Sequence, residues 1–105
     1  MARKKVILDP LVQKFIAVTK KKFSAQIILF GSRARGDNLV TSDYDFLIIS
    51  HLFESMHPLD RIPALLKNWH APLAVDLIAY TPEEYKKRSE MLTTASIIKK
   101  EGIVV

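Results

Sequence analysis

Three aspartates in this sequence could together bind a divalent cation. Asp43 and Asp45 are separated by one residue at the start of an apolar segment. In a strand their side chains would leave the same face, roughly 6 to 7 Å apart along the strand axis. Two carboxylates at this spacing can close on a cation, whereas without one they repel each other and at least one tends to take up a proton. The pair alone is weak evidence, because two solvated acids at a strand start have the same spacing.

A third acid, Asp76, interrupts the apolar segment Leu73–Tyr80, which is expected to be a strand. An unpaired charge buried in such a strand is costly, so Asp76 needs a partner. If this strand lies beside the one that carries Asp45, the three acids form the oxygen-rich site that Mg²⁺ prefers. The alternative is an ion pair between Asp76 and a nearby Lys or Arg.

The segment Gly31–Gly36, with the sequence Gly-Ser-Arg-Ala-Arg-Gly, has the composition of a phosphate-binding loop. Gly31 permits a close approach of the backbone N–H groups to a ligand, and the Ser32 hydroxyl can bind phosphate oxygens. Arg33 and Arg35 add positive charge. Alone the segment could be a turn, but beside the acids phosphate binding is the favoured interpretation.

The elements that must position these residues follow from the apolar periodicity. Asp9 and Pro10 are typical of a helix N-cap and of proline at the first helical position, and this helix is expected to run to about Lys22. Its buried face should carry apolar residues at spacings of four and three, namely Leu11, Phe15 and Val18. Apolar runs predict strands over 26–30 and 44–50, joined by a loop with about one helical turn.

A second helix is expected between the second and third strands. Asp60 is its predicted N-cap, which places Pro63 in the first turn, where proline is tolerated. The apolar residues that mark this helix are Leu59, Ile62, Leu65, Leu66 and Trp69.

Two further helices are expected after the third strand. Thr81, Pro82 and Glu84 form a capping-box pattern that begins the first of them. The last helix should stop at Gly102 and leave an apolar tail, Ile103–Val105, that could pair at a sheet edge.

This order of elements predicts an α/β fold of the α+β type, with helices packed on a small mixed sheet. The connection between the first two strands is too short for a helical crossover, so these strands should be antiparallel. A chain of 105 residues fits one domain, spanning residues 1–105, with one site.

The composition is that of an ordinary globular protein, with 49% apolar and 26% charged residues. No apolar run approaches the roughly 20 residues that cross a bilayer, so no membrane association is expected. Asp9 and Pro10 interrupt the first apolar run before it reaches signal-peptide length, and no cysteine is present for disulfides or a thiolate zinc site. The expected location is the cytoplasm.

A net charge of +5 favours anionic partners such as nucleotides, RNA or an acidic protein. Three of the four basic clusters fall at expected helix ends, where cations complement the helix dipole, and no aromatic residues interleave with them. Solvated helix ends are therefore favoured over a nucleic-acid track. The clusters are Arg3–Lys5, Lys20–Lys22, Lys86–Arg88 and Lys99–Lys100.

The combined motifs resemble those of the minimal nucleotidyltransferases of the DNA polymerase beta superfamily. The ten residues between Ser32 and Asp43 fit the spacing of that family, and the resemblance covers nearly the whole chain. It rests on the segments Leu29–Gly36, Ser42–Ile48, Val75–Ile78 and Tyr80–Tyr85.

The resemblance implies the nucleotidyltransferase fold and transfer of a nucleoside monophosphate, AMP from ATP in the first instance, to an acceptor hydroxyl with release of pyrophosphate. Two Mg²⁺ ions would be held by Asp43 and Asp45, while Asp76 would bind the catalytic ion and help deprotonate the acceptor. The implied phosphate ligands are Gly31 and Ser32, with Arg33 or Arg35 neutralising the developing charge.

Members of this family are often antitoxins of small helical HEPN-type toxins, and some attach AMP to a toxin tyrosine. The resemblance therefore implies such a toxin as partner and acceptor, and a homo- or hetero-oligomer is possible. Apolar residues near the ends, including Ile103–Val105, could serve an interface, although an edge strand is the favoured interpretation. The competing hypotheses are a non-catalytic antitoxin that neutralises its partner by binding alone, and RNA binding through the basic surface.

Overall fold

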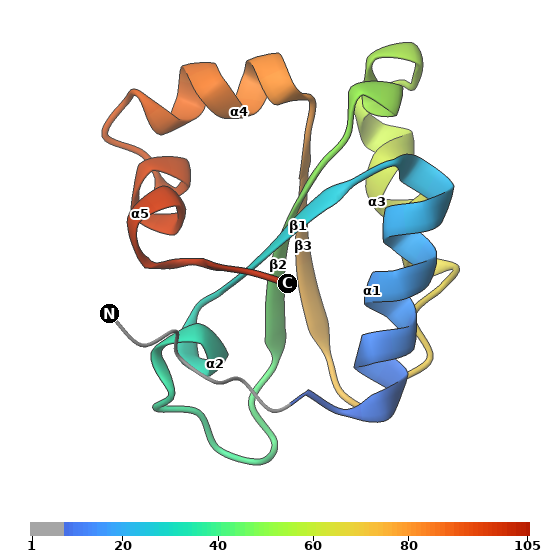
Figure 1. Ribbon diagram of the computed structural model, residues 1–105, viewed down its shortest axis with the longest axis vertical. Coiled ribbons are helices and arrows are strands. Elements are labelled where there is room, and N and C mark those ends of the chain that lie inside the picture. Colours follow the sequence, from blue (N-terminus) through green and yellow to red (C-terminus); the bar gives the residue numbers. More distant parts are fainter. Residues whose placement is uncertain (1–7) are drawn as a thin grey trace.

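A four-stranded sheet organises the computed structural model, which describes residues 8–105 (Figure 1). Its strands are β1 Gln26–Phe30, β2 Tyr44–Ile49, β3 Val75–Tyr80 and β4 Ile103–Val104. Their order in the sheet is β3-β2-β1-β4. Strand β1 is antiparallel to β2 and to β4, whereas β2 and β3 are parallel. The predicted mixed sheet and its antiparallel first pair are confirmed.

Helices cover both faces of this sheet (Figure 1). One face carries α1, Pro10–Phe23, and α3, Pro58–Leu66, and the other carries α4, Pro82–Ser89, and α5, Thr94–Glu101. A short helix, α2, Ser32–Arg35, connects β1 to the loop before β2. Among the described residues, no helix has the length and apolar character needed to cross a membrane.

Strand β2 shows how alternating side chains build a core on each face. Tyr44, Phe46 and Ile48 pack in the cluster on the α1 and α3 side, whereas Leu47 and Ile49 pack with the α5 residue Ile98 on the other side. Because successive side chains of a strand point to opposite faces, β2 contributes to two cores. Asp45 therefore lies on the α4 and α5 side.

Helix α1 begins as predicted but buries a different face. The Asp9 carboxylate accepts a hydrogen bond from the Leu11 N–H at 2.8 Å, and Pro10 is the first helical residue. The prediction of Leu11 and Val18 on the buried face was wrong, since Leu11 is 42% exposed and Val18 is half-buried. The buried residues are Val12, Phe15, Ile16, Thr19 and Phe23. The predicted and the observed buried faces share Phe15, and apolar periodicity alone fits both faces.

Helix α3 begins three residues before the predicted start. Its N-cap is His57, whose Nδ1 accepts from the Leu59 N–H at 3.1 Å, and Pro58 occupies the first position. Asp60 is therefore a residue of the first turn, not the N-cap, and Pro63 lies inside the helix. The prediction failed because an imidazole nitrogen can cap a helix as a carboxylate does.

Arg61 ties α3 to β3 and α4 from a buried position. Its Nη1 donates to Glu84 Oε1 at 2.6 Å and to the Ala79 carbonyl at 3.2 Å, and its Nη2 donates to the Phe53 carbonyl at 3.2 Å. Glu84 also completes the predicted capping box with Thr81 at the start of α4. These bonds fix where α4 leaves the sheet.

The end of the chain forms the edge strand β4, which lies next to β1. Helix α5 ends at Gly102, and Ile103 and Val104 then pair with Leu29 and Ile28 of β1. The predicted edge strand is confirmed. The basic clusters predicted at helix ends are confirmed in the last turns of α1, α4 and α5, whereas Arg3–Lys5 lies outside the described residues.

Candidate active site

Asp45 and Asp76 lie side by side on neighbouring strands. In the parallel pairing of β2 with β3 they are register partners, which confirms that the third strand lies beside the second. Asp43 comes directly before β2, which begins at residue 44 as predicted, so only Asp45 of this pair is a strand residue. Alternation still places Asp43 on the same side of the chain as Asp45, because buried Tyr44 between them points to the α1 core.

The three acids differ in exposure. Asp45 is half-buried, whereas Asp43 and Asp76 are exposed. The prediction that Asp76 is a buried charge in need of a partner was therefore wrong. Strand β3 is at the edge of the sheet, and Asp76 is near its first residue, where solvent reaches the carboxylate.

The electrostatics of the acid group centre on Asp45. Burial is the largest cause that raises the pKa of Asp45, and the negative charges of Asp76 and Asp43 raise it further. A side-chain hydrogen bond with Asp76 acts in the same direction, while the positive charge of Arg35 opposes them. The site thus concentrates negative charge that a cation would neutralise.

Gly31 places the predicted phosphate loop directly against this acid. Its φ of 75° and ψ of −157° belong to a backbone region that is essentially restricted to glycine. A Cβ on this residue would collide with Asp45 Oδ2 and lie 3.0 Å from Asp45 Cγ. The loop and the carboxylate can be this close only because residue 31 has no side chain.

Ser32 begins α2, and the turn that follows is closed by backbone hydrogen bonds. The amides of Ala34 and Arg35 both donate to the Gly31 carbonyl at 3.1 Å, and the Gly36 amide donates to the Ser32 carbonyl at 2.9 Å. Within residues 8–105 the Ser32 hydroxyl makes no hydrogen bond. It is thus available to a ligand beside Gly31.

The two arginines of the loop have different surroundings. Arg35 is half exposed, forms a surface ion pair with Asp37 at 3.2 Å and acts electrostatically on Asp45. Arg33 instead lies over the Tyr44 ring and donates hydrogen bonds to the carbonyls of the loop before β2. The structure therefore brings Arg35, but not Arg33, to the acid side of β2.

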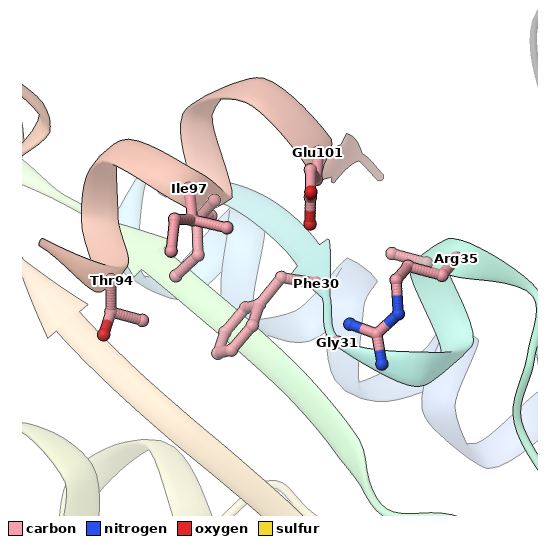
Figure 2. Close-up of a pocket in the computed structure, with 8 residues that line it drawn as sticks. Phe30, Gly31, Arg35, Thr94, Ile97 and Glu101 are labelled. Atoms are coloured by element: carbon pink, nitrogen blue, oxygen red, sulfur yellow. The ribbon is translucent and has the colours of Figure 1, made fainter.

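A hollow of about 90 Å³ lies next to Gly31, between α2 and α5. Figure 2 shows Arg35 and Glu101 facing it from these two helices, with the Phe30 ring along its floor. This volume is far below the roughly 300 to 1,000 Å³ of pockets that enclose a whole small-molecule ligand. The hollow is therefore too small to enclose a whole nucleotide.

Sequence reasoning missed two features of this face. Phe30 is the register partner of Asp45 across β1 and β2, so it forms the apolar side of the acid group. Strand alternation could have found it. Glu101 and Thr94 of α5 line the hollow, but no motif distinguishes them from surface residues of an amphipathic helix.

The three acids have the oxygen donors that a divalent cation requires. Among residues 8–105, no three Asp, Glu or His side chains lie close enough to form a ready-made metal site. The donors nevertheless fit a hard cation, since Asp45 adjoins Asp76, interacts with the charge of Asp43 and has a raised pKa. The exposed side chains of Asp43 and Asp76 can change rotamer to complete such a site.

Paired acids on a mixed sheet, with a glycine and serine loop against one of them, bring donors suited to a cation and to a phosphate group to one place. The chain belongs to the nucleotidyltransferase domain family, whose model matches residues 12–105. Domains of this family generally use a nucleoside triphosphate and a divalent metal. No curated protein matches the chain.

The solved structures that share this fold include two with provisional names. One is a protein from Sulfolobus solfataricus, provisionally named a nucleotidyltransferase, with 25% sequence identity and a TM-score of 0.64 over 90% of this chain and 75% of that one. The second, also provisionally named a nucleotidyltransferase, has 27% identity and a TM-score of 0.55 over 75% of this chain and 87% of its own. The predicted nucleotidyltransferase fold is confirmed.

Proposed function

We propose that this protein is a Mg²⁺-dependent nucleotidyltransferase that transfers AMP from ATP to a hydroxyl of a HEPN-type toxin, and so acts as its antitoxin in the cytoplasm. Membership of the family supports nucleotidyl transfer in general. The observation that carries the site is the contact of the Gly31 backbone with Asp45, whose register partner is Asp76. Phosphate binding and acid chemistry thus meet at one point. The proposal treats residues 1–105 as one domain.

The proposed roles follow from these positions. Two Mg²⁺ ions, when bound, would neutralise the triphosphate charge and the charge that develops during transfer. Asp43 and Asp45 would hold both ions and Asp76 one of them. Gly31 and Ser32 would bind the terminal phosphates with the help of a guanidinium.

The reaction breaks one bond and forms another. The acceptor oxygen attacks the α-phosphorus, the bond from that phosphorus to the bridging oxygen of the β-phosphate breaks, and pyrophosphate leaves. The proton of the acceptor hydroxyl passes to the Asp76 carboxylate, which solvent reaches at the edge of the sheet. In this scheme most of the catalysis comes from positioning and electrostatics.

A protein acceptor is supported by exposed apolar side chains in the loop before Asp43. Leu39 and Val40 are 73% and 88% exposed in the loop that leads to Asp43. Exposed apolar residues at the rim of a site favour docking of another protein over a small hydrophilic acceptor. A tyrosine on a docked helical toxin would then reach the open face.

One observation favours the alternative, an antitoxin that binds its partner without catalysis. The described residues contain no ready-made group of three metal donors. A protein that had kept the fold but not the chemistry would also bind through the exposed residues of the loop. The two functions differ in whether a covalent label is transferred.

The deciding experiment follows label from α-labelled ATP with Mg²⁺ into proteins of a lysate of the source organism. Wild type is compared with Asp45→Asn, which keeps the shape of the side chain and removes its charge. Asp60→Asn is the matched control, because Asp60 is an exposed acid on α3, on the opposite face of the sheet.

Label in one protein, lost with Asp45→Asn and kept with Asp60→Asn, would establish the transfer and identify the acceptor. No label with any of the four triphosphates, while a stable complex with a toxin still forms, would replace the proposed enzyme by the binding antitoxin.

A further inference from the structure

Arg33, in the loop between β1 and β2, is held by three hydrogen bonds and one ring contact. Its Nε and Nη2 donate to the Ser42 carbonyl at 3.0 and 2.9 Å, and Nη2 also donates to the Val40 carbonyl at 3.0 Å. The guanidinium carbon lies 4.0 Å from the centre of the Tyr44 ring. The edge of the guanidinium that carries Nε and Nη2, and one face of its plane, are therefore engaged within the protein.

These contacts place the guanidinium on the side of β2 away from the carboxylates. Tyr44 is only 2% exposed and belongs to the core that α1 and α3 cover. Asp43 and Asp45, the neighbours of Tyr44 in the chain, point to the opposite side. To reach a phosphate at the acids, Arg33 would have to leave all three hydrogen bonds and the ring.

The Ser42 carbonyl belongs to the peptide group that contains the Asp43 amide. On the other side of Asp43, the Tyr44 amide donates to the Ala74 carbonyl of the segment before β3 at 3.0 Å. Asp43 is thus the link between a peptide group held by Arg33 and one held by the sheet. Its carboxylate is exposed and makes no ion pair among the described residues, so these two peptide groups set the position of its Cα and Cβ atoms.

We propose that Arg33 is a positioning residue, which fixes the peptide group before Asp43 so that this acid can close on a cation, and that Arg35 alone supplies the guanidinium for the phosphates. The inference rests on the proposed function. Arg33 belongs to α2 at the phosphate loop and donates hydrogen bonds to the segment that leads to Asp43. It therefore also connects the phosphate loop to the acids.

Lysine separates the two roles. An arginine that mainly neutralises phosphate charge can be replaced in part by lysine, which carries the same charge. A fork that bonds two carbonyls and lies flat on a ring cannot, because an ammonium group is a point donor without a planar face. Arg33→Lys and Arg35→Lys are therefore a matched pair of variants in the same short helix.

The first measurement is Mn²⁺ binding to the protein without nucleotide, by electron paramagnetic resonance. Arg33→Lys and Arg33→Gln should weaken Mn²⁺ binding by roughly 10- to 100-fold, the loss that follows removal of groups that orient metal ligands. Arg35→Lys and Arg35→Gln should not weaken it, since the charge of Arg35 opposes a cation at Asp45. In label transfer, Arg33→Lys should lower kcat at saturating Mn²⁺ with little change in KM for ATP, whereas Arg35→Gln should raise that KM and Arg35→Lys should restore it in part.

A measurement on the wild type covers the case in which the Arg33 variants do not fold. In NMR spectra of arginine side chains, the Arg33 Nε–H signal should keep its position when a non-hydrolysable ATP analogue is added with Mg²⁺, and the Arg35 signal should shift. A shift of the Arg33 signal with a constant Arg35 signal would overturn the proposal, as would wild-type Mn²⁺ affinity in Arg33→Lys. If wild type and all variants bind no Mn²⁺, the proposed function fails and this inference fails with it.

Discussion

Substitution of Gly31 by alanine tests whether the phosphate loop and the acid group form one unit. The backbone at this residue, with φ 75° and ψ −157°, is strained for any residue with a Cβ, at a cost of about 1 to 3 kcal/mol. The added methyl group also collides with Asp45 Oδ2, and overpacking of this kind costs about 1 to 3 kcal/mol. Because the Asp45 side chain can move and relieve part of the collision, we expect Gly31→Ala to lose about 2 to 4 kcal/mol.

The assay is urea unfolding followed by circular dichroism. A domain of this size has a stability of about 5 to 15 kcal/mol, so the variant should remain folded in buffer. Gly36→Ala is the control, since Gly36 also has a positive φ, 85°, but with ψ 12° it lies in the milder left-handed region. It should lose about 1 to 2 kcal/mol and keep nucleotidyl transfer, which Gly31→Ala should abolish.

A double-mutant cycle with Asp45→Ala isolates the collision. If the methyl group meets the carboxylate as the structure shows, the Asp45→Ala background should reduce the stability lost on Gly31→Ala. The reduction relative to wild type should be at least about 1 kcal/mol. Equal costs in the two backgrounds, or an active and stable Gly31→Ala protein, would refute the reasoning.

Three further predictions concern charge and ligands. Asp45→Asn should stabilise the metal-free protein at neutral pH by about 0.2 to 1 kcal/mol, because it relieves repulsion by Asp76 and Asp43; a lower urea midpoint than wild type would contradict this. Burial alone would raise the pKa of Glu84, but hydrogen bonds from Thr81 and Arg61 hold this pKa below 4.5. Glu84 therefore stabilises the fold above pH 4.5, and this contribution is lost as the pH falls through the lowered pKa. Glu84→Gln should therefore cost about 1 kcal/mol at pH 7, a value reduced because 35% of the side chain is exposed, and its unfolding midpoint should converge with that of wild type as the pH falls below 4.5. Mg²⁺ with ATP should raise the Tm of wild type but not of Asp45→Asn, and no shift in wild type with any triphosphate would count against the site.

Strand β1 could be predicted because its end carries a strong local signal. Strand β1 has the predicted bounds, 26–30, since Gly31 ends an uninterrupted apolar run. The start of α4 was equally clear, because the capping box of Thr81 and Glu84 satisfies two backbone amides with two side chains. Where one local interaction decides an element, the sequence is enough.

The sequence did not predict features that depend on neighbouring elements. The exposure of Asp76 follows from the position of β3 at the edge of the sheet, and the apolar pattern of that strand suggested burial instead. The buried face of α1 depends on which of two overlapping apolar stripes meets the sheet. Both outcomes are set by tertiary packing.

The two arginines of the phosphate loop have roles that the sequence could not assign. Residues two apart in a helix point about 200° away from each other, so Arg33 and Arg35 could not both have faced a ligand from one helical turn. The sequence left open whether Arg33 or Arg35 neutralises the phosphate charge, and only the fold showed that Arg33 lies over Tyr44 whereas the charge of Arg35 acts on Asp45.

Two features that oppose stability coincide at the candidate site. One is a backbone conformation at Gly31 that only glycine tolerates, and the other is a group of like charges around Asp45. A module that only binds a partner through Leu39 and Val40 would need neither of them. A site that holds a triphosphate and its cations accounts for both, because the cations supply the missing positive charge and the absent side chain lets the loop backbone lie against the Asp45 carboxylate. This coincidence is the structural reason to favour transfer over binding alone.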